Sequence, residues 1–328
     1  MNYKYSHFQK ILHGFFLSSQ FMRETSFEFE RRVFFNNSAD DGNDQHVFIV
    51  SLARSGTTVL LNALHDSQQF SSLSYADMPF VMSPNLWNLI TPNQQHNPPK
   101  ERMHGDGILI TSRSPEAFEE VFWKTFESES SARKEYFKKY TSLINQRYGR
   151  SRYLSKNNQN IKRIKLLTSI FPKAKILILF REPIEHCLSL YKQHKKFVSI
   201  QQSDSFVSKY MEWIGHSEFG LTYKPLYTND ISYADSNSFD HWLEQWILSY
   251  QHLVADFAYH NNITFVSYEK LCENAQTWEA VKDICEIRND YNPENKFILA
   301  NQSRDHNCSR GLAVRAKAIY DQLTELSI

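Results

Sequence analysis

Glycine is scarce in this sequence, with 9 residues in a chain of 328. Average usage is about 7%, so the chain has well under half the usual number. A glycine that lies inside an ordered motif is therefore more informative here than in most proteins. Gly56 is such a residue, because it stands between a buried apolar run and a helical pattern.

Neither sign of charge is in excess, since 37 basic and 36 acidic residues leave a formal net charge of +1. Extensive binding to nucleic acid or to a membrane surface requires a strong basic excess. We therefore expect no nucleic-acid partner. The 13 histidines show no HExxH or similar ligand spacing, so we also expect no metal.

Cysteines and long apolar runs are few as well. The four cysteines are scattered and form no CxxC pair, which favours reduced, mostly structural thiols in a cytoplasmic protein. The apolar run 176–180 is far shorter than the roughly 20 residues that cross a membrane. The sequence also starts without an apolar segment and a cleavage site. We expect a soluble, cytoplasmic protein with no membrane span.

Short apolar runs alternate with helical patterns along the chain. Strands are predicted at 46–51, 153–155, 175–180 and 263–266, and a helix is predicted to begin at Ser114-Pro115-Glu116. Residues 83–102 are interpreted as a long loop, and 200–237 as an insertion or lid. Such alternation predicts an α/β protein, a P-loop-like three-layer fold with a central parallel sheet flanked by helices.

The first of these strands leads into a motif that suits an anion. Leu52-Ala53-Arg54-Ser55-Gly56-Thr57-Thr58 would turn the chain into a helix, whose amino end gathers backbone N–H groups and positive potential. Gly56 permits a close approach of the backbone. Ser55, Thr57 and Thr58 add hydroxyl donors, and Arg54 adds a cation. The alternative is an ordinary strand-to-helix turn in which the threonines cap the helix.

The motif differs from the P-loop of nucleotide kinases. Alignment on Gly56 puts Thr57 where a kinase has its lysine. A kinase also needs a carboxylate at a strand end to hold Mg²⁺, whereas the run 175–180 ends in Arg181. A cation at that place favours direct pairing with a phosphate, without a metal.

Four segments in order resemble the sulfotransferase family that uses PAPS (3′-phosphoadenosine 5′-phosphosulfate). FIVSLARSGTTVLLNAL (48–64) is similar to the family's 5′-phosphosulfate loop, and ILILFREPIEHCLSLY (176–191) to its 3′-phosphate motif. Between them, YLSKNNQNIKRI and FPKAK look like the family's lysine-containing segment and Phe-Pro turn. VSYEKL (266–271) resembles a later family element.

The resemblance implies a single sulfotransferase domain over 1–328, with a peripheral lead-in (1–45), a PAPS-binding core (46–272) and C-terminal helices (273–328). It implies a sulfuryl transfer from PAPS to an acceptor hydroxyl, with no metal required. The residues implied to bind PAPS are Arg54, Ser55, Gly56, Thr57, Thr58, Arg181 and Ser189.

The resemblance also implies catalytic roles for Arg54, for Lys156 and for an acid that acts as base. Arg54 stands where the small-molecule branch has lysine, which is the pattern of the carbohydrate and protein-tyrosine branch. In that branch an acid after the first helix serves as base, usually Glu; here the matching residue is Asp77. Asp77 is also explained as a turn cap, and His104-Gly105-Asp106-Gly107 as a turn bordering the acceptor cleft.

Two other functions stay open from the sequence. One is a P-loop small-molecule kinase that uses ATP, and the other is a non-catalytic anion- or glycan-binding protein on the same fold. The acceptor stays open among glycans, lipids, small alcohols and tyrosyl peptides, and so does the oligomeric state. A basic stretch is either a solvated face or a surface that attracts an anionic glycan. It comprises Arg147, Arg150, Arg152, Lys162, Arg163 and Lys165.

Overall fold

The computed structural model describes most of the chain. The described residues are 6–35, 44–91, 98–127, 131–228, 231–288, 290–293, 297–299 and 308–328. Among the helices of these ranges, none is long and apolar enough to cross a membrane.

Six strands and thirteen α-helices are defined in these ranges, with two short 3₁₀ helices. The strands are β1 (Val47–Val50), β2 (Lys100–Glu101), β3 (Leu109–Ile110), β4 (Leu154–Lys156), β5 (Lys175–Phe180) and β6 (Ile263–Ser267). The first helices are α1 (His7–Ser18), α2 (Gln20–Phe34), α3 (Thr57–Asp66), η2 (Tyr75–Asp77), α4 (Pro84–Ile90), α5 (Glu120–Thr125) and α6 (Ser131–Tyr148). The rest are η3 (Asn158–Arg163), α7 (Ile164–Ile170), α8 (Pro183–Ser203), α9 (Ser205–Trp213), α10 (Phe239–Phe257), α11 (Tyr268–Glu273), α12 (Ala275–Ile284) and α13 (Arg310–Leu326).

A four-stranded parallel sheet in the order β4-β1-β5-β6 forms the centre of the fold. Ile49 lies opposite Lys156, and Phe180 lies opposite Ser267. The carboxyl ends of all four strands therefore meet at one edge. The strand that follows β1 in this sheet, β4, lies on one side of it, and the next strand, β5, lies on the other, so the strand order reverses beside β1. Open α/β sheets bind their ligands at the carboxyl edge next to such a reversal.

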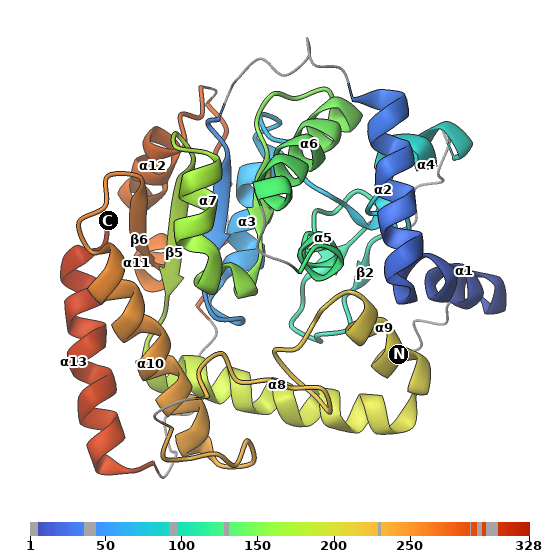
Figure 1. Cartoon of the computed structure of the whole chain (residues 1–328). Coiled ribbons are helices and arrows are strands. Elements are labelled where there is room, and N and C mark those ends of the chain that lie inside the picture. Colours follow the sequence, from blue (N-terminus) through green and yellow to red (C-terminus); the bar gives the residue numbers. More distant parts are fainter. Residues whose placement is uncertain are drawn as a thin grey trace.

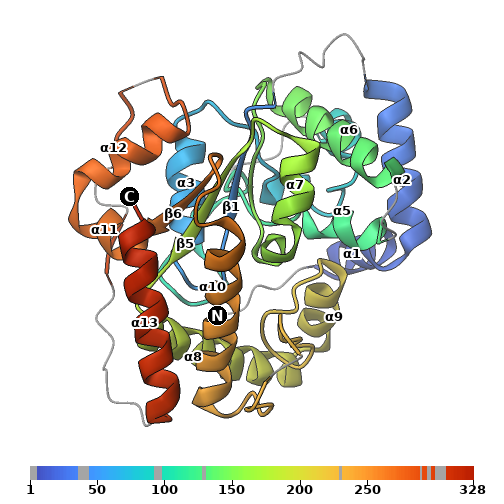
Figure 2. The ribbon, with the colours of Figure 1, turned by 60° about the vertical axis from the view of Figure 1, so that its left-hand side comes forward.

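The two faces of the sheet are buried by different helices, as the alternation of side chains along a strand requires. Val47 and Ile49 belong to a core with residues of α3, α11 and α12. Phe48 and Val50 belong to the larger core, which includes residues of α7 and α10. Figures 1 and 2 show these helices on opposite sides of the sheet. The predicted three-layer α/β fold is confirmed.

The strands and their following helices lie close to where the sequence predicts them. Pro183 is the first residue of α8, and the Ser238 side chain accepts a hydrogen bond from the amide of Asp240 at the start of α10. In Figure 1, α8 crosses the bottom of the view, below the sheet. This helix therefore lies across the carboxyl ends of the strands.

The segment 83–127 departs from prediction. The helix expected at Ser114 begins at Glu120 instead. The Ser114 hydroxyl accepts from the amide of Thr111 (3.0 Å), and the amide of Glu116 donates to the carbonyl of Leu73 (3.0 Å). The first bond closes a turn at 111–114, and the second, with the antiparallel bridge between Ser74 and Pro115, pairs this segment with residues 73–74 where a capping pattern alone predicts a helix. Part of the expected loop 83–102 forms α4, and the described residues of 200–237 include the end of α8 and all of α9.

Candidate active site

The turn between β1 and α3 is held by one hydrogen bond to the sheet and one within the turn. The Ser51 hydroxyl donates to the carbonyl of Leu179 (2.6 Å), and the Ser55 hydroxyl donates to the carbonyl of Leu52 (3.0 Å). Gly56 has a φ of 92°, in the left-handed region that favours glycine. A Cβ atom at Gly56 would lie 2.2 Å from Cδ2 of Tyr268. Both the backbone angle and the close ring explain why one of the few glycines stands here.

A cavity of about 550 Å³ opens beside this turn, at the carboxyl edge of the sheet. Six of the predicted site residues line it, namely Arg54, Gly56, Thr57, Thr58, Lys156 and Arg181. Residues 210–219, within the segment expected to form an insertion or lid, contribute Tyr210, Met211 and Phe219 to the wall. The other predicted residues, Ser55, Ser189 and Asp77, are not part of the lining.

Arg54 joins the turn to α8. Its Nε donates to the hydroxyl of Ser189 at 3.1 Å, although the two residues are 135 positions apart. Its Nη1 donates to Oδ2 of Asp106 at 2.5 Å. The guanidinium therefore links the segment 48–64, to which it belongs, to Ser189 in the segment 176–191 and to Asp106.

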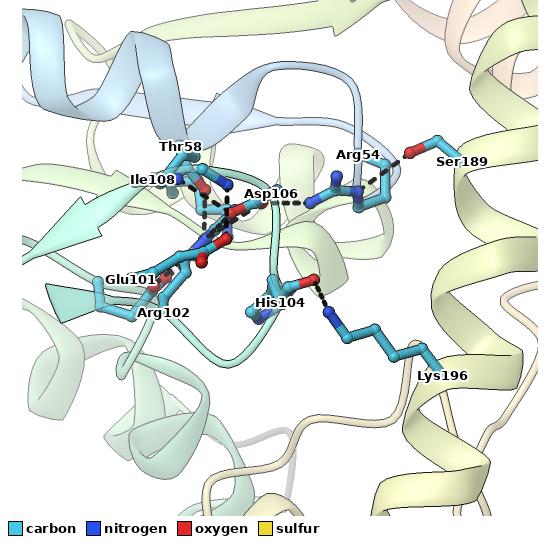
Figure 3. A network of polar contacts seen from close by, with 12 residues as sticks. Arg54, Thr58, Glu101, Arg102, His104, Asp106, Ile108, Ser189 and Lys196 are labelled. Carbon is cyan, nitrogen blue, oxygen red and sulfur yellow. Dashed lines mark hydrogen bonds and ion pairs between the residues drawn. The ribbon is translucent and has the colours of Figure 1, made fainter. Parts of the chain in front are cut away.

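A second arginine extends this cluster, as Figure 3 shows. Arg102, the residue after β2, is buried and donates through Nη2 to Asp106 (2.5 Å) and through Nη1 to the hydroxyl of Thr58 (3.1 Å). Burial raises the pKa of Asp106, but the hydrogen bonds and charges of Arg102 and Arg54 outweigh burial and leave it below its usual value. The cluster therefore holds a carboxylate anion between two guanidiniums, next to the turn.

Sequence reasoning did not assign Arg102 to the site. The nearest signal is the turn 104–107, which the sequence predicts to be either a simple turn or a border of the acceptor cleft. His104, Asp106 and Gly107 line the cavity. Arg102 reaches the site because the short hairpin β2–β3 folds back over the first turn of α3, and spacing along the chain does not reveal such a contact.

Arg181 follows β5 and lines the same cavity. Its Nη2 lies 3.0 Å from Oε2 of Glu185, and its guanidinium lies 5.8 Å from the centre of the Tyr268 ring. Within the described part of the chain its buried Nε has no hydrogen-bond partner. Since the Tyr268 ring also packs against Gly56, Arg181 and the glycine turn flank one aromatic ring at one edge of the sheet.

Lys156 and Glu116 line the cavity beside Arg102, whose Nη1 lies 3.6 Å from Oε2 of Glu116. Lys156 ends β4, and its Nζ lies 3.5 Å from Oε1 of Glu116. The hydroxyl of Tyr75 donates to Oε2 of Glu116 at 3.1 Å. Burial raises the pKa of Glu116, but the charges of Lys156 and Arg102 outweigh it and bring the pKa below its usual value of 4.5. Glu116 is therefore an ionised carboxylate on the cavity wall at neutral pH.

His104 is a second proton acceptor on the lining. Burial, with a smaller effect from Arg102, lowers its pKa well below its usual value of 6.5. Its buried Nδ1 has no hydrogen-bond partner among the described residues, and its ring packs edge-on against Phe197. The imidazole is therefore neutral at neutral pH.

Asp77, the predicted base, lies away from the cavity. It is fully buried, and its Oδ2 accepts hydrogen bonds from the amide of Ser74 (2.8 Å) and the hydroxyl of Tyr148 (2.5 Å). Its Oδ1 lies 3.8 Å from Nε of Arg147. The capping explanation left open by the sequence describes this geometry, because Asp77 closes the 3₁₀ turn η2. Among the described residues, the acidic side chains on the cavity lining are Asp106, Glu116, Glu120 and Glu218.

No metal centre accompanies these groups in the described ranges, where no set of three or more His, Cys, Asp or Glu side chains is arranged to hold an ion. Among the described residues, the arginine and lysine side chains on the cavity lining are Arg54, Arg102, Lys156 and Arg181.

Comparison with known proteins agrees with this geometry. The family model described as the sulfotransferase family matches residues 46–218, which is more than half of the 328 residues. No curated protein matches the sequence significantly. Among solved structures, sulfotransferase STF1 from Mycobacterium tuberculosis H37Rv is similar, with a TM-score of 0.50 and 12% identity over 98% of this chain and 86% of that chain. Sulfotransferase STF9 from Mycobacterium avium has a TM-score of 0.48 and 10% identity, over 98% of this chain and 79% of that chain.

The likeness to STF1 supports the fold, and the family match extends from the residue before β1 through the glycine turn, Lys156 and Arg181 into the segment that covers the cavity. This chain belongs to the sulfotransferase family.

Proposed function

We propose that this protein transfers a sulfuryl group from PAPS to a hydroxyl of a carbohydrate acceptor. The observation that carries the proposal is the convergence of the glycine turn, Arg54 and Arg181 on one cavity. These groups come from the two segments that the sequence assigns to the two phosphate ends of the nucleotide.

The residues present fit a doubly phosphorylated adenosine. The Asp106 carboxylate between Arg54 and Arg102 marks a place suited to an anion, next to the amino end of α3. Arg181 lines the same cavity, and its buried Nε is a donor that no described residue uses, so it can bind a second phosphate. In this assignment Arg54, Arg102 and the turn bind the 5′-phosphosulfate and Arg181 binds the 3′-phosphate, while Ser189 positions Arg54 through the hydrogen bond between them. Tyr268 offers a ring surface between the two.

PAPS supplies an activated sulfuryl group, whose bond to the bridging oxygen of the phosphate breaks as a bond to the acceptor oxygen forms. Glu116 takes the proton from the acceptor hydroxyl, since it is ionised and lies on the cavity wall. Lys156, 3.5 Å from Glu116, adds positive charge where negative charge develops on the transferred group. Arg54 stabilises the leaving phosphate.

Ligand-dependent melting tests the nucleotide. PAP (3′-phosphoadenosine 5′-phosphate) without Mg²⁺ should raise the melting temperature, because a ligand at a hundred times its Kd stabilises the folded state by about 2.7 kcal/mol. Arg181→Ala should abolish that shift, whereas Arg315→Ala should keep it. Arg315 is the matched control, because it is an exposed arginine on α13.

A labelled-sulfuryl assay completes the test by following transfer from PAPS to a panel of oligosaccharides. Stabilisation by ATP–Mg²⁺ and not by PAP would establish the kinase alternative. A PAP shift without transfer to any hydroxyl acceptor would leave the non-catalytic binding protein as the better description.

A further inference from the structure

A second, larger cavity lies beside the active site. Its volume is about 850 Å³. It is bounded by the outer face of α3, the segment 111–115 and the end of α6. Val59 and Ile108 line both cavities. The two spaces therefore adjoin at the first turn of α3 and the β2–β3 hairpin, the region that Figure 3 shows around Thr58 and Ile108.

The second cavity has a basic wall. Three arginines, Arg113, Arg147 and Arg150, line it together with His65, and among the described residues Asp66 is the one acidic residue on its lining. Arg113 and Arg150 are exposed, and no ion pair involves either of them within the described ranges. The Arg150 guanidinium contacts only neutral acceptors there, the carbonyl of Gly149 (3.3 Å) and the side-chain oxygen of Gln68 (3.4 Å).

The basic stretch noted in the sequence is thus divided by the fold. Arg147 and Arg150 line the second cavity, whereas Arg152 donates to backbone carbonyls, including that of Cys285 (2.6 Å). Arg163 pairs with Glu120 at 2.6 Å. Of the six members, Arg147 and Arg150 line the second cavity, and the fold adds Arg113 from a distant segment. Arg147 also lies 3.8 Å from the buried carboxylate of Asp77, whereas Arg150 is exposed.

The rest of the wall is rich in neutral polar groups. Amide and hydroxyl side chains come from α3, α4, the segment 111–114 and the turn after α3, namely Asn62, Gln68, Asn88, Thr111, Ser112 and Ser114. Amides and hydroxyls both donate and accept hydrogen bonds, and sugar hydroxyls need partners of this kind. Phe70 and Tyr148 add ring surface.

We propose that the second cavity binds the anionic groups of a carbohydrate acceptor, whose neighbouring sugar reaches the active-site cavity past Val59 and Ile108. Carboxylate or sulfate groups of the glycan pair with Arg113, Arg147 and Arg150. Its sugar hydroxyls form hydrogen bonds with the amide and hydroxyl side chains of the cavity wall. This inference rests on the proposed function and narrows its acceptor to a negatively charged glycan of several sugars.

The test measures binding of short dextran sulfate oligosaccharides to the whole protein, without nucleotide, by titration calorimetry. The wild type should bind them, and neutral dextran oligosaccharides of the same length should bind weakly or not at all. Affinity should fall as salt is raised, because exposed charges are screened within about 10 Å at 0.1 M. Arg113→Ala with Arg150→Ala should weaken binding about five- to tenfold, as expected when two exposed charge contacts are lost.

The matched control is Arg32→Ala with Arg315→Ala, which removes the same charge from exposed sites on α2 and α13. Equal weakening by both pairs, or no binding by the wild type, would overturn the inference. Equally tight binding of polyglutamate of matched charge would assign the cavity to acidic peptides instead. The PAP-induced melting shift is read in every variant, so a normal shift with lost oligosaccharide binding separates this inference from the proposed function.

Discussion

The Nε of Arg54 donates a hydrogen bond to the hydroxyl of Ser189 at 3.1 Å, and this contact joins the glycine turn to α8. The two residues belong to the two separate segments, 48–64 and 176–191, that resemble nucleotide-binding motifs of the family. Ser189 does not line the cavity itself, so its effect on a nucleotide passes at least partly through the position of Arg54.

Arg54→Ala and Ser189→Ala should therefore be non-additive in PAP binding. Contacting residues show coupling energies of about 0.5–3 kcal/mol, whereas distant residues add independently. Titration of PAP into the wild type, both single variants and the double variant measures the coupling. Strict additivity would show that Ser189 and Arg54 act on the nucleotide separately. Ser189→Ala with Arg315→Ala supplies the additive reference pair.

Gly56→Ala should disable the phosphate loop. A left-handed φ costs a non-glycine residue about 1–2 kcal/mol, and the new methyl group would lie 2.2 Å from the Tyr268 ring. The expected result is a lower melting temperature and no PAP-induced shift. Gly149→Ala is the control, because Gly149 also has a positive φ of 64° but no atom lies within 4 Å of its added Cβ. If Gly56→Ala retained the PAP shift of the wild type, the loop would not bind the nucleotide.

Glu116→Gln should lower kcat by about a hundred- to ten-thousandfold, the usual contribution of a positioned base, while the PAP melting shift is kept. Because the pKa of Glu116 is below its usual 4.5, the ionised form persists as the pH falls. Wild-type kcat should stay level from pH 7 to about 5 and fall only below that range. A pH series of initial rates measures both.

The kcat of His104→Gln shows whether His104, instead of Glu116, is the base that takes the proton from the acceptor hydroxyl. His104 is neutral at neutral pH and lines the same cavity, so its loss would reduce kcat if it took the proton. We expect His104→Gln to retain kcat within about tenfold. A kcat lost in His104→Gln and retained in Glu116→Gln would transfer the role to the histidine.

Asp77→Asn should keep the sulfotransfer rate, because Asp77 caps η2 and lies outside the cavity lining. Its effect should appear in stability. Burial raises the pKa of Asp77 above its usual 3.8, although bonds from Tyr148 and Ser74 oppose the rise. A raised carboxyl pKa favours the fold below the usual value, and this contribution is lost as the pH rises through the folded pKa.

Chemical denaturation from pH 3 to 8 should therefore show less dependence on pH in Asp77→Asn than in the wild type. Asp77→Ala, which leaves the Tyr148 hydroxyl and the Ser74 amide without their acceptor, should cost about 1–3 kcal/mol at all these pH values. A large loss of kcat in Asp77→Asn, with an unchanged melting temperature, would restore Asp77 as the base.

Local patterns are enough to predict the elements that carry the nucleotide motifs. The run 175–180 forms β5 at those residues, and Pro183 begins α8 as its fixed φ favours. The motif at Ser114 fails because the hydrogen bond from Glu116 to Leu73 and the bridge between Ser74 and Pro115 pair this segment with residues 73–74. A capping pattern marks where a helix can start, and packing decides whether it does.

The sequence by itself determined the parallel sheet, the strand–turn–helix around Gly56 and the place of Arg181 at a strand end. These features depend on residues that are neighbours along the chain, so periodicity, glycine and proline reveal them. Only the tertiary structure decided that Arg102 reaches the turn, that Glu116 lies on the cavity wall and Asp77 does not, and that Arg113 joins Arg147 and Arg150. Those contacts join segments far apart in sequence, and they form only when the hairpin and the helices pack on the edge of the sheet.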